Sequence, residues 1–360
     1  MSALQTTLPT SDAKHHLRIV TNSELREARA CMRRHRIKYI LRRRPRGNAE
    51  PLTFGTLAHT GHEAWMLARA NSRDPSDLYS AAVDAVRAAA DAARQTDDPI
   101  SDYMLVTVEE LLRGYTARWA DAAMRTVAVE QSFDVPLVNP ETGAASRTFR
   151  IGGKFDSIVA TPHGEGEQLH VFELKTTGSD IEAGSLYWEK VRALDSQVSI
   201  YINGARGAGY DVADCIYSVI RKPGIKPLKA TPEESRKWTK PTKADPTPRL
   251  YANQREHDET PEEYRIRLRV DIEENPGRYY ARATIVRLEH DEREHAFDMW
   301  QSAKMLHEAE RSGFAPRNVD ACAAFGGCAY LAVCTGQASL DDDRLFRTAA
   351  GPHEELMPVE

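Results

Sequence analysis

Apolar residues in the N-terminal third of the chain recur every three to four positions, which is the period of an amphipathic helix. Helices are predicted there over residues 23–41, 54–70, 77–95 and 101–124. Ser23 is a suitable N-cap for the first of these, with Glu24 and Glu27 in the turn that follows. The basic run from residue 42 to Pro51 separates that helix from the next.

From residue 126 the pattern changes to short runs rich in β-branched and aromatic residues, bounded by glycine and proline, which is typical of strands. Strands are predicted over residues 126–137, 147–161, 168–177, 215–222 and 281–288, and helices over residues 180–209, 260–274 and 294–312. The expected fold class is therefore α/β, with a mixed central sheet flanked by helices.

These changes of pattern also predict how the chain is organised. The expected parts are a flexible N-terminal lead (1–22), an N-terminal helical region (23–125), a central core (126–222), a basic proline-rich loop or insertion (223–259), a C-terminal strand and helices with a cysteine cluster (260–338) and a polar tail (339–360).

Composition narrows the class of protein. Hydrophobic residues make up 41% of the 360 and charged residues 28%, so the chain can bury a core and wholesale disorder is excluded. No apolar run approaches the roughly 20 residues that cross a bilayer, and the polar start has no secretory apolar segment. A cytoplasmic protein without a membrane partner is expected.

Charge is unevenly distributed although the net charge is only −5. Residues 14–46 hold twelve Lys or Arg against two acidic residues, and residues 221–249 hold nine against three. Such basic islands suit phosphate binding. Taken singly, each is more typical of a solvated helix face or a flexible linker.

Three of the five cysteines lie close together, at Cys322, Cys328 and Cys334. Disulfides are uncommon in a reducing cytoplasm, so this spacing favours a metal or cluster site that lacks its fourth ligand. Cys31 is the candidate for that ligand, and Cys215, in an apolar strand-like run, is the alternative. Burial of all five as small apolar side chains is the competing interpretation.

Candidate catalytic side chains lie on two predicted neighbouring strands. Gly153-x-x-Asp156 ends one, and Glu173-Leu174-Lys175 lies in the next, where alternation places Glu173 and Lys175 on one face. Carboxylates on one sheet face suit a hard divalent cation such as Mg²⁺ or Mn²⁺. A solvated face with two acids and a lysine would show the same pattern.

Two helical pairs accompany these strands. Gln197 and Tyr201 lie one turn apart on the helix that follows the second strand, so both can face the sheet. His59 and Glu63 have the same spacing near the start of an earlier helix, where His62 is an alternative to His59. Each histidine alone is more typical of a helix interior than of a ligand.

The ordered set Cys31, Gly55-Thr-x-x-His59, Gly153-x-x-Asp156, Glu173-x-Lys175, Gln197-x-x-x-Tyr201 and the C-terminal cysteine trio resembles the RecB-like branch of the PD-(D/E)XK nucleases. More narrowly it is similar to the iron–sulfur members, namely the AddB-type nuclease domain and the CRISPR-associated exonucleases. This resemblance implies a restriction-endonuclease-like sheet, with the N-terminal helical region and the C-terminal segment joined by an iron–sulfur cluster.

The resemblance also implies roles for individual residues. His59, Asp156, Glu173 and the carbonyl of Leu174 would hold Mg²⁺ or Mn²⁺, while Lys175, Gln197 and Tyr201 complete the catalytic set. A [4Fe–4S] cluster would be bound by Cys31, Cys322, Cys328 and Cys334, with zinc as the competing occupant. Tyr187 and Trp188 either stack on bases of a single strand or pack in the core.

The implied function is a metal-dependent DNA nuclease, an exonuclease of recombination, repair or phage DNA processing, whose basic islands contact phosphates of single-stranded or duplex ends. The chain has no G-x-x-x-x-G-K-[ST] loop, so a helicase or CRISPR/recombination partner would be a separate chain. The alternatives are a catalytically silent DNA-binding adaptor of the same fold, a metal-assisted hydrolase of another substrate, and a zinc-stapled interaction module.

Overall fold

The computed structural model describes residues 17–47, 50–72, 74–96, 99–240, 247–323 and 327–356. Most of the predicted N-terminal lead (1–16), the middle of the proline-rich stretch (241–246) and the last residues of the predicted tail (357–360) lie outside the described residues. No helix of the described part is long and apolar enough to cross a membrane.

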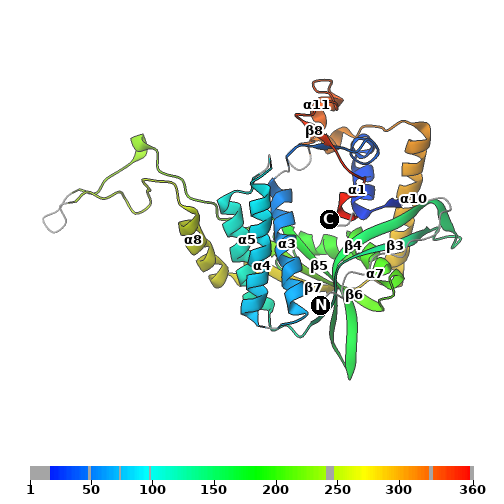
Figure 1. Cartoon of the computed structure of the whole chain (residues 1–360), viewed down its shortest axis with the longest axis horizontal. Coiled ribbons are helices and arrows are strands. Elements are labelled where there is room, and N and C mark those ends of the chain that lie inside the picture. Colours follow the sequence, from blue (N-terminus) through cyan, green and yellow to red (C-terminus); the bar gives the residue numbers. More distant parts are fainter. Residues whose placement is uncertain are drawn as a thin grey trace.

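The described strands form a six-stranded mixed sheet and a separate two-stranded one (Figure 1). The large sheet contains β1 (Arg18–Val20), β3 (Arg125–Val138), β4 (Ala145–His163), β5 (Gly166–Thr177), β6 (Val212–Arg221) and β7 (Tyr280–Ile285). β5 and β6 pair in parallel, whereas β4 pairs antiparallel with both β3 and β5. β2 (Arg43–Pro45) pairs with β8 (Phe346–Thr348) in the small sheet.

Helices cover both faces of the large sheet. One face carries α3 (Glu50–Arg69), α4 (Pro75–Ala93), α5 (Asp102–Trp119) and α8 (Pro261–Glu274). The other carries α1 (Asn22–Ala30), α6 (Leu186–Leu194), α7 (Ser196–Gly207) and α10 (Glu289–Ser312). A buried apolar cluster fills each interface. The predicted α/β class, a mixed sheet flanked by helices, is therefore confirmed.

The strands β4 and β5 separate in the middle of the sheet. Their ladder runs from His163↔Gly166 to Ser157↔Phe172 and ends there. β3 occupies the other edge of β4, so β1 and β5 share one edge, and β1 pairs only with Phe149–Ile151. Residues 152–156 are thus left without a strand on that edge, and we call this opening the fork.

The predicted first helix, residues 23–41, is wrong as one continuous element. Its N-cap is Thr21, which accepts a hydrogen bond from Glu24 N, and α1 ends at Ala30 because Cys31 is extended, with φ −162° and ψ 110°. The chain resumes as α2 (Met32–His35) and a π-helical turn (Arg36–Ile40). Tertiary contact explains the break, because Arg33 N donates to Pro316 O at 3.0 Å.

The remaining predicted elements lie within a few residues of the observed ones, except that residues 180–209 form two helices, α6 and α7. Short elements complete the described part: α9 (Pro276–Tyr279), α11 (Leu331–Cys334) and 3₁₀ turns at Glu233–Ser235, Val319–Cys322 and Glu354–Leu356. Between β6 and α8 the chain projects away from the body, as Figure 1 shows.

Candidate active site

The two carboxylates of the predicted motif meet at the fork. Asp156 and Glu173 would be the next pair of the β4–β5 ladder, but the strands have separated there. Instead, Leu174 N donates to Oδ2 of Asp156 at 2.7 Å. Glu173 is more deeply placed, with 2% of its side chain exposed against 14% for Asp156. The predicted convergence of these two side chains is what the fork provides.

His59 reaches the fork from α3. Its Nδ1 lies 3.5 Å from Oδ1 of Asp156, and the preceding turn packs against the end of β5, where a Cβ on Gly55 would lie 3.5 Å from the Thr176 hydroxyl. Burial alone would lower the pKa of His59, but the Asp156 carboxylate outweighs burial and raises it. The direction of this shift shows that His59 interacts with the Asp156 carboxylate, and as a metal ligand His59 would bind as the neutral imidazole.

His62, the alternative to His59, lies elsewhere. It is 2% exposed, stacks against the rings of Trp65 and Phe172 and contacts Tyr115 Oη through Nε2 at 3.2 Å. Burial lowers the pKa of His62 to about 3. It belongs to the helical core and not to the cleft.

The α7 pair comes from the opposite helical layer. Gln197 Nε2 donates to Glu173 Oε1 at 3.1 Å and to Tyr201 Oη at 2.7 Å. The side chain of Asp195 caps α7 by accepting from Gln197 N at 3.0 Å, which fixes the start of the helix. The site is therefore assembled from both faces of the sheet, α3 on one and α7 on the other.

Lys175 forms an ion pair with Glu173 Oε1. Burial would lower the pKa of Lys175, but Glu173 and Asp156 outweigh burial and raise it. The amine is therefore an ammonium ion at neutral pH, which suits it to stabilise phosphate charge. A general base at neutral pH would need a lowered pKa, so the raised pKa of Lys175 argues against that role.

Glu173 carries the strongest indication of a bound cation. Its Oε2 is buried and has no hydrogen-bond partner, and burial together with Asp156 raises its pKa to about 8. Buried carboxylate oxygens are normally satisfied, and a divalent cation shared with Asp156 would satisfy this one. The donor set therefore fits Mg²⁺ or Mn²⁺, although over the described residues no three His, Cys, Asp or Glu side chains are already arranged as a metal site.

A cleft of about 840 Å³ opens beside His59 and Asp156. It contains two charged residues that sequence reasoning missed, Glu130 and Lys154, which form an ion pair. Lys154 could have been predicted, because it lies two residues before Asp156 on the same strand face. Glu130 could not, because it lies in the cleft with a left-handed backbone at φ 52°, which no pattern indicates.

A second hollow of about 740 Å³ is lined by Lys175. Thr176 and Thr177 line both hollows, so the end of β5 separates them. Tyr187 lines the second hollow, whereas Trp188 is 3% exposed and donates to Ile181 O at 2.8 Å. Core packing is therefore the correct interpretation for Trp188.

The four predicted cluster cysteines lie where the two ends of the described chain meet. Cys31 follows α1. Cys322, Cys328 and Cys334 lie in the C-terminal segment, whose start is bound to α1 and α2: Asn318 donates to Ala30 O, and Arg33 N donates to Pro316 O. Burial raises the pKa of Cys334, and the thiols of Cys328, Cys31 and Cys322 add to that effect. All four are half-buried free thiols, whereas Cys215 is fully buried in β6.

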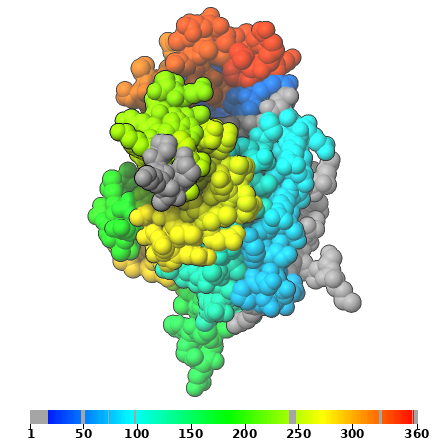
Figure 2. Space-filling model, turned by 90° about the vertical axis from the view of Figure 1, so that its left-hand side faces the viewer, coloured from blue at the N-terminus to red at the C-terminus, as the bar shows by residue number. Residues whose placement is uncertain are grey.

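The first basic island has a largely structural role. Its arginines donate to main-chain oxygens of the C-terminal segment: Arg33 to Ala315, Arg42 to Ala350, Arg43 to Leu340 and Arg44 to Pro352. In Figure 2 this segment, orange and red, lies against the blue N-terminal residues. The expectation that this island contacts phosphates is therefore not supported for these four side chains.

The chain has no match among curated proteins. The crystal structure of SSO0001 aligns with 62% of this chain and 76% of that one at 16% identity and a TM-score of 0.19, a similarity too low to carry an argument. The family profile of the PD-(D/E)XK nuclease superfamily, by contrast, matches residues 20–335, which include every candidate catalytic residue at the fork. The chain belongs to the PD-(D/E)XK nuclease superfamily.

Proposed function

We propose that this protein is a metal-dependent deoxyribonuclease whose reaction takes place at the fork. Its family consists of nucleases that are generally metal-dependent. The observation that carries the proposal is the buried, unpartnered Oε2 of Glu173 beside Asp156 and the ammonium of Lys175. Together they offer a cation site and a phosphate contact within one opening of the sheet.

The residues that would hold Mg²⁺ or Mn²⁺ are His59, Asp156, Glu173 and the carbonyl of Leu174. When bound, the cation would supply Lewis acidity toward the scissile phosphate and the attacking water. Lys175 is placed to stabilise the negative charge that grows on the phosphate oxygens. Gln197 holds the Glu173 carboxylate in position and is itself oriented by Tyr201.

The narrower proposal is a RecB-like exonuclease that acts on DNA ends in the cytoplasm, in recombination, repair or phage DNA processing. The order of its motifs supports this, as do five free cysteines, which suit a reducing compartment. Residues 126–222 would form its nuclease core, with residues 23–125 and 260–338 attached. A helicase or a CRISPR/recombination protein would be its partner.

The cysteines are proposed to bind a [4Fe–4S] cluster. Support comes from the hydrogen bonds that join the segment around Cys31 to the segment that precedes the C-terminal trio; among the described residues the thiols do not form a closed ligand set. Visible absorbance with iron and sulfide analysis of anaerobically purified protein tests this directly. Loss of colour and of stability together in Cys322→Ala is expected. A colourless protein that contains zinc would overturn it.

Cleavage of internally labelled linear, nicked and circular DNA with Mg²⁺ or Mn²⁺ tests the nuclease proposal. Wild type should degrade linear DNA, Lys175→Ala should not, and the exposed-lysine control Lys304→Ala should behave as wild type. Circular dichroism and thermal unfolding verify that each variant is folded. A folded wild type, fully loaded with metal, that binds DNA and cleaves none of these substrates would instead be the silent adaptor.

A further inference from the structure

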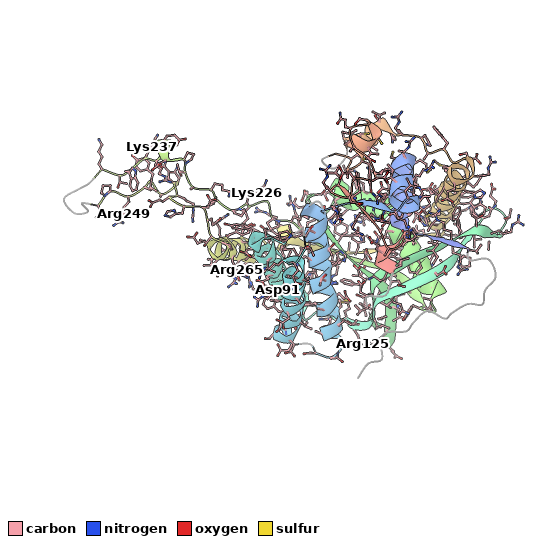
Figure 3. All side chains as sticks on the ribbon, turned by 45° about the horizontal axis from the view of Figure 1, so that its top comes forward. Asp91, Arg125, Lys226, Lys237, Arg249 and Arg265 are labelled. Carbon is pink, nitrogen blue, oxygen red and sulfur yellow. The ribbon has the colours of Figure 1, made fainter. Side chains whose placement is uncertain are left out.

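The chain between β6 and α8 forms a projecting arm, defined here as the described residues 226–240 and 247–259 (Figures 1 and 3). Hydrogen bonds hold its two sides together. At the base Glu259 N donates to Leu228 O and Leu228 N donates to the Glu259 side chain, both at 2.8 Å, and further out Thr231 N donates to Arg255 O at 2.9 Å. Trp238 and Leu250 form an antiparallel bridge near the far end. The described part of the arm is thus a hairpin and not an unstructured linker.

The arm starts at the rim of the catalytic cleft. Lys222, four residues before it, donates its amide to Thr177 O at 2.7 Å, and its ammonium lies 4.7 Å from the centre of the Phe54 ring. Lys222 and Thr177 both line the cleft that contains His59 and Asp156. A nucleic-acid strand that leaves the cleft over this rim therefore meets the base of the arm first.

The outer half of the arm is basic and aromatic. Residues 236–251 hold five Lys or Arg and one acidic residue. Trp238 is 48% exposed and Tyr251 46%, so part of each ring is open to a ligand. Figure 3 places Lys237 and Arg249 in this outer half, beyond Lys226 and far from the sheet.

The base and the outer half differ in how their charges are used. At the base, Lys229 pairs with Asp258 at 2.9 Å and Arg255 with Glu263 at 2.7 Å, so these cations stabilise the hairpin itself. Lys237 and Lys240 are exposed, and within the described ranges no acidic side chain pairs with either. Their charge is available to a ligand of opposite sign.

Cross-strand pairing sets the directions of the outer side chains. Trp238 lies opposite Leu250, and Tyr251 N donates to Lys237 O at 3.1 Å. In an antiparallel pair, opposed residues share a face and neighbours along a strand alternate. Tyr251 and Lys237 therefore share one face, while the Trp238 ring offers a second stacking surface on the reverse.

We propose that the arm binds single-stranded DNA that emerges from the cleft, with Tyr251 and Trp238 stacking on unpaired bases and Lys237 and Lys240 contacting phosphates. Aromatic side chains beside lysines form the usual platform for unpaired strands, whereas duplex DNA offers no exposed base faces. The direction of the strand, out of the cleft, depends on the proposed nuclease function, but binding by the arm does not.

The length of the arm sets how long a single DNA strand bound in the cleft must be to reach its outer half. Lys237 follows Lys222 by 15 residues, which spans at most about 50 Å when extended. At roughly 3.4 Å per stacked nucleotide this corresponds to about 15 nucleotides. A strand of about 6 nucleotides bound in the cleft would end before the outer half of the arm, and one of about 30 would pass it.

Binding of labelled single strands of these two lengths, measured by fluorescence anisotropy in EDTA so that none is cleaved, tests the proposal. Trp238→Ala/Tyr251→Ala should weaken binding of the long strand about tenfold or more and leave the short strand unchanged. The control Phe314→Ala removes an even more exposed ring, 65% exposed, two residues after the end of α10. It should change neither affinity.

Salt dependence tests the lysines separately. Lys237→Glu/Lys240→Glu should reduce the slope of log affinity against log salt for the long strand by about 1.4, since each phosphate contact on a single strand contributes about 0.7. The charge control Lys304→Glu, on α10, should leave the slope at the wild-type value.

Equal affinity of the arm variants and wild type for the long strand would overturn the arm proposal. If the arm variants instead sediment differently from wild type, the arm would be assigned to contact with a second copy of this chain. An equal loss for blunt duplex would overturn the single-strand assignment. If wild type cleaves DNA while the arm variants bind normally, only this inference fails. If wild type cleaves no DNA but the arm variants lose binding, the nuclease proposal fails and the arm remains a binding element.

Discussion

The amide of Leu174 donates a 2.7 Å hydrogen bond to Oδ2 of Asp156, one position past the last ladder pair of β4 and β5. The bond replaces the missing ladder contact, so the backbone of β5 itself orients the Asp156 carboxylate. Oδ1 is left to face His59. A group held in this way is positioned before any substrate arrives, which is what electrostatic catalysis requires.

Asp156→Asn should separate this structural role from the catalytic one. The amide oxygen can still accept from Leu174 N, but the negative charge that a cation needs is gone. We expect cleavage of linear DNA to fall by about a hundredfold or more, while the far-ultraviolet circular dichroism spectrum stays that of a folded protein. The control Asp84→Asn changes an exposed aspartate on α4 and should cleave as wild type does. Wild-type cleavage by Asp156→Asn would remove Asp156 from the site.

Divalent cations should stabilise the folded protein in the absence of DNA. Glu173 Oε2 is buried without a hydrogen-bond partner, and a cation that satisfies it binds only the folded state. At about 100 times its Kd the cation would add about 2.7 kcal/mol to the free energy of unfolding, seen as a higher Tm in Mn²⁺ than in EDTA. Glu173→Gln should abolish the increase. A Tm that does not respond to Mn²⁺ or Mg²⁺ in wild type would contradict the site.

The sequence was sufficient to predict which side chains share a face near the fork, although not the separation of the strands. Strand alternation placed Glu173 and Lys175 on one face, and helical spacing placed Gln197 beside Tyr201, because both periods are fixed by local geometry. In the fold these four side chains are linked one to the next: Lys175 pairs with Glu173, and Gln197 donates to both Glu173 and Tyr201. Local periodicity does not show which histidine of a distant helix reaches the site. In the fold, α3 places His59 beside Asp156 and buries His62 in the helical core.

Features that depend on tertiary contact were not predictable from the sequence. The break at Cys31 occurs in a segment whose composition suits a continuous helix, and it follows from docking against residue 316. The left-handed backbone of Glu130 could not be predicted from the sequence either, since glycine or asparagine would be expected at such a position. The proline content suggested a loop or insertion. The described part is a hairpin, because non-proline residues on its two sides form main-chain hydrogen bonds with each other.

Gly153 allows the Phe133 ring to pack beneath the catalytic strand. A Cβ at this position would lie 2.6 Å from the ring, so Gly153→Ala should lower the free energy of unfolding by about 1–3 kcal/mol through overpacking. Denaturant unfolding measures this. Gly178→Ala is the matched control, because a Cβ there meets nothing within 4 Å. Equal stability of the two variants would show that Phe133 moves aside without cost.

His62 should make stability depend on pH. Burial lowers the pKa of His62 in the folded protein to about 3 from the ordinary 6.5. Below about pH 6.5 the imidazole is therefore protonated in the unfolded chain, whereas in the folded protein it stays neutral down to about pH 3. Stability from this group is full above pH 6.5 and is lost as pH falls, by up to about 1.4 kcal/mol per pH unit. Between about pH 7.5 and 5 the loss should reach about 2 kcal/mol.

Comparison with His62→Gln isolates that contribution from other titrating groups, including Glu173, whose raised pKa acts in the opposite direction over part of this range. The variant is expected to be less stable than wild type at pH 7.5, because it loses the stacking on Trp65 and Phe172. That deficit should shrink by about 2 kcal/mol at pH 5, where wild type carries the proton penalty and the variant does not. Urea unfolding at both pH values measures it. A deficit independent of pH would mean that His62 is protonated in the fold, and therefore less deeply isolated from solvent than its 2% exposure indicates.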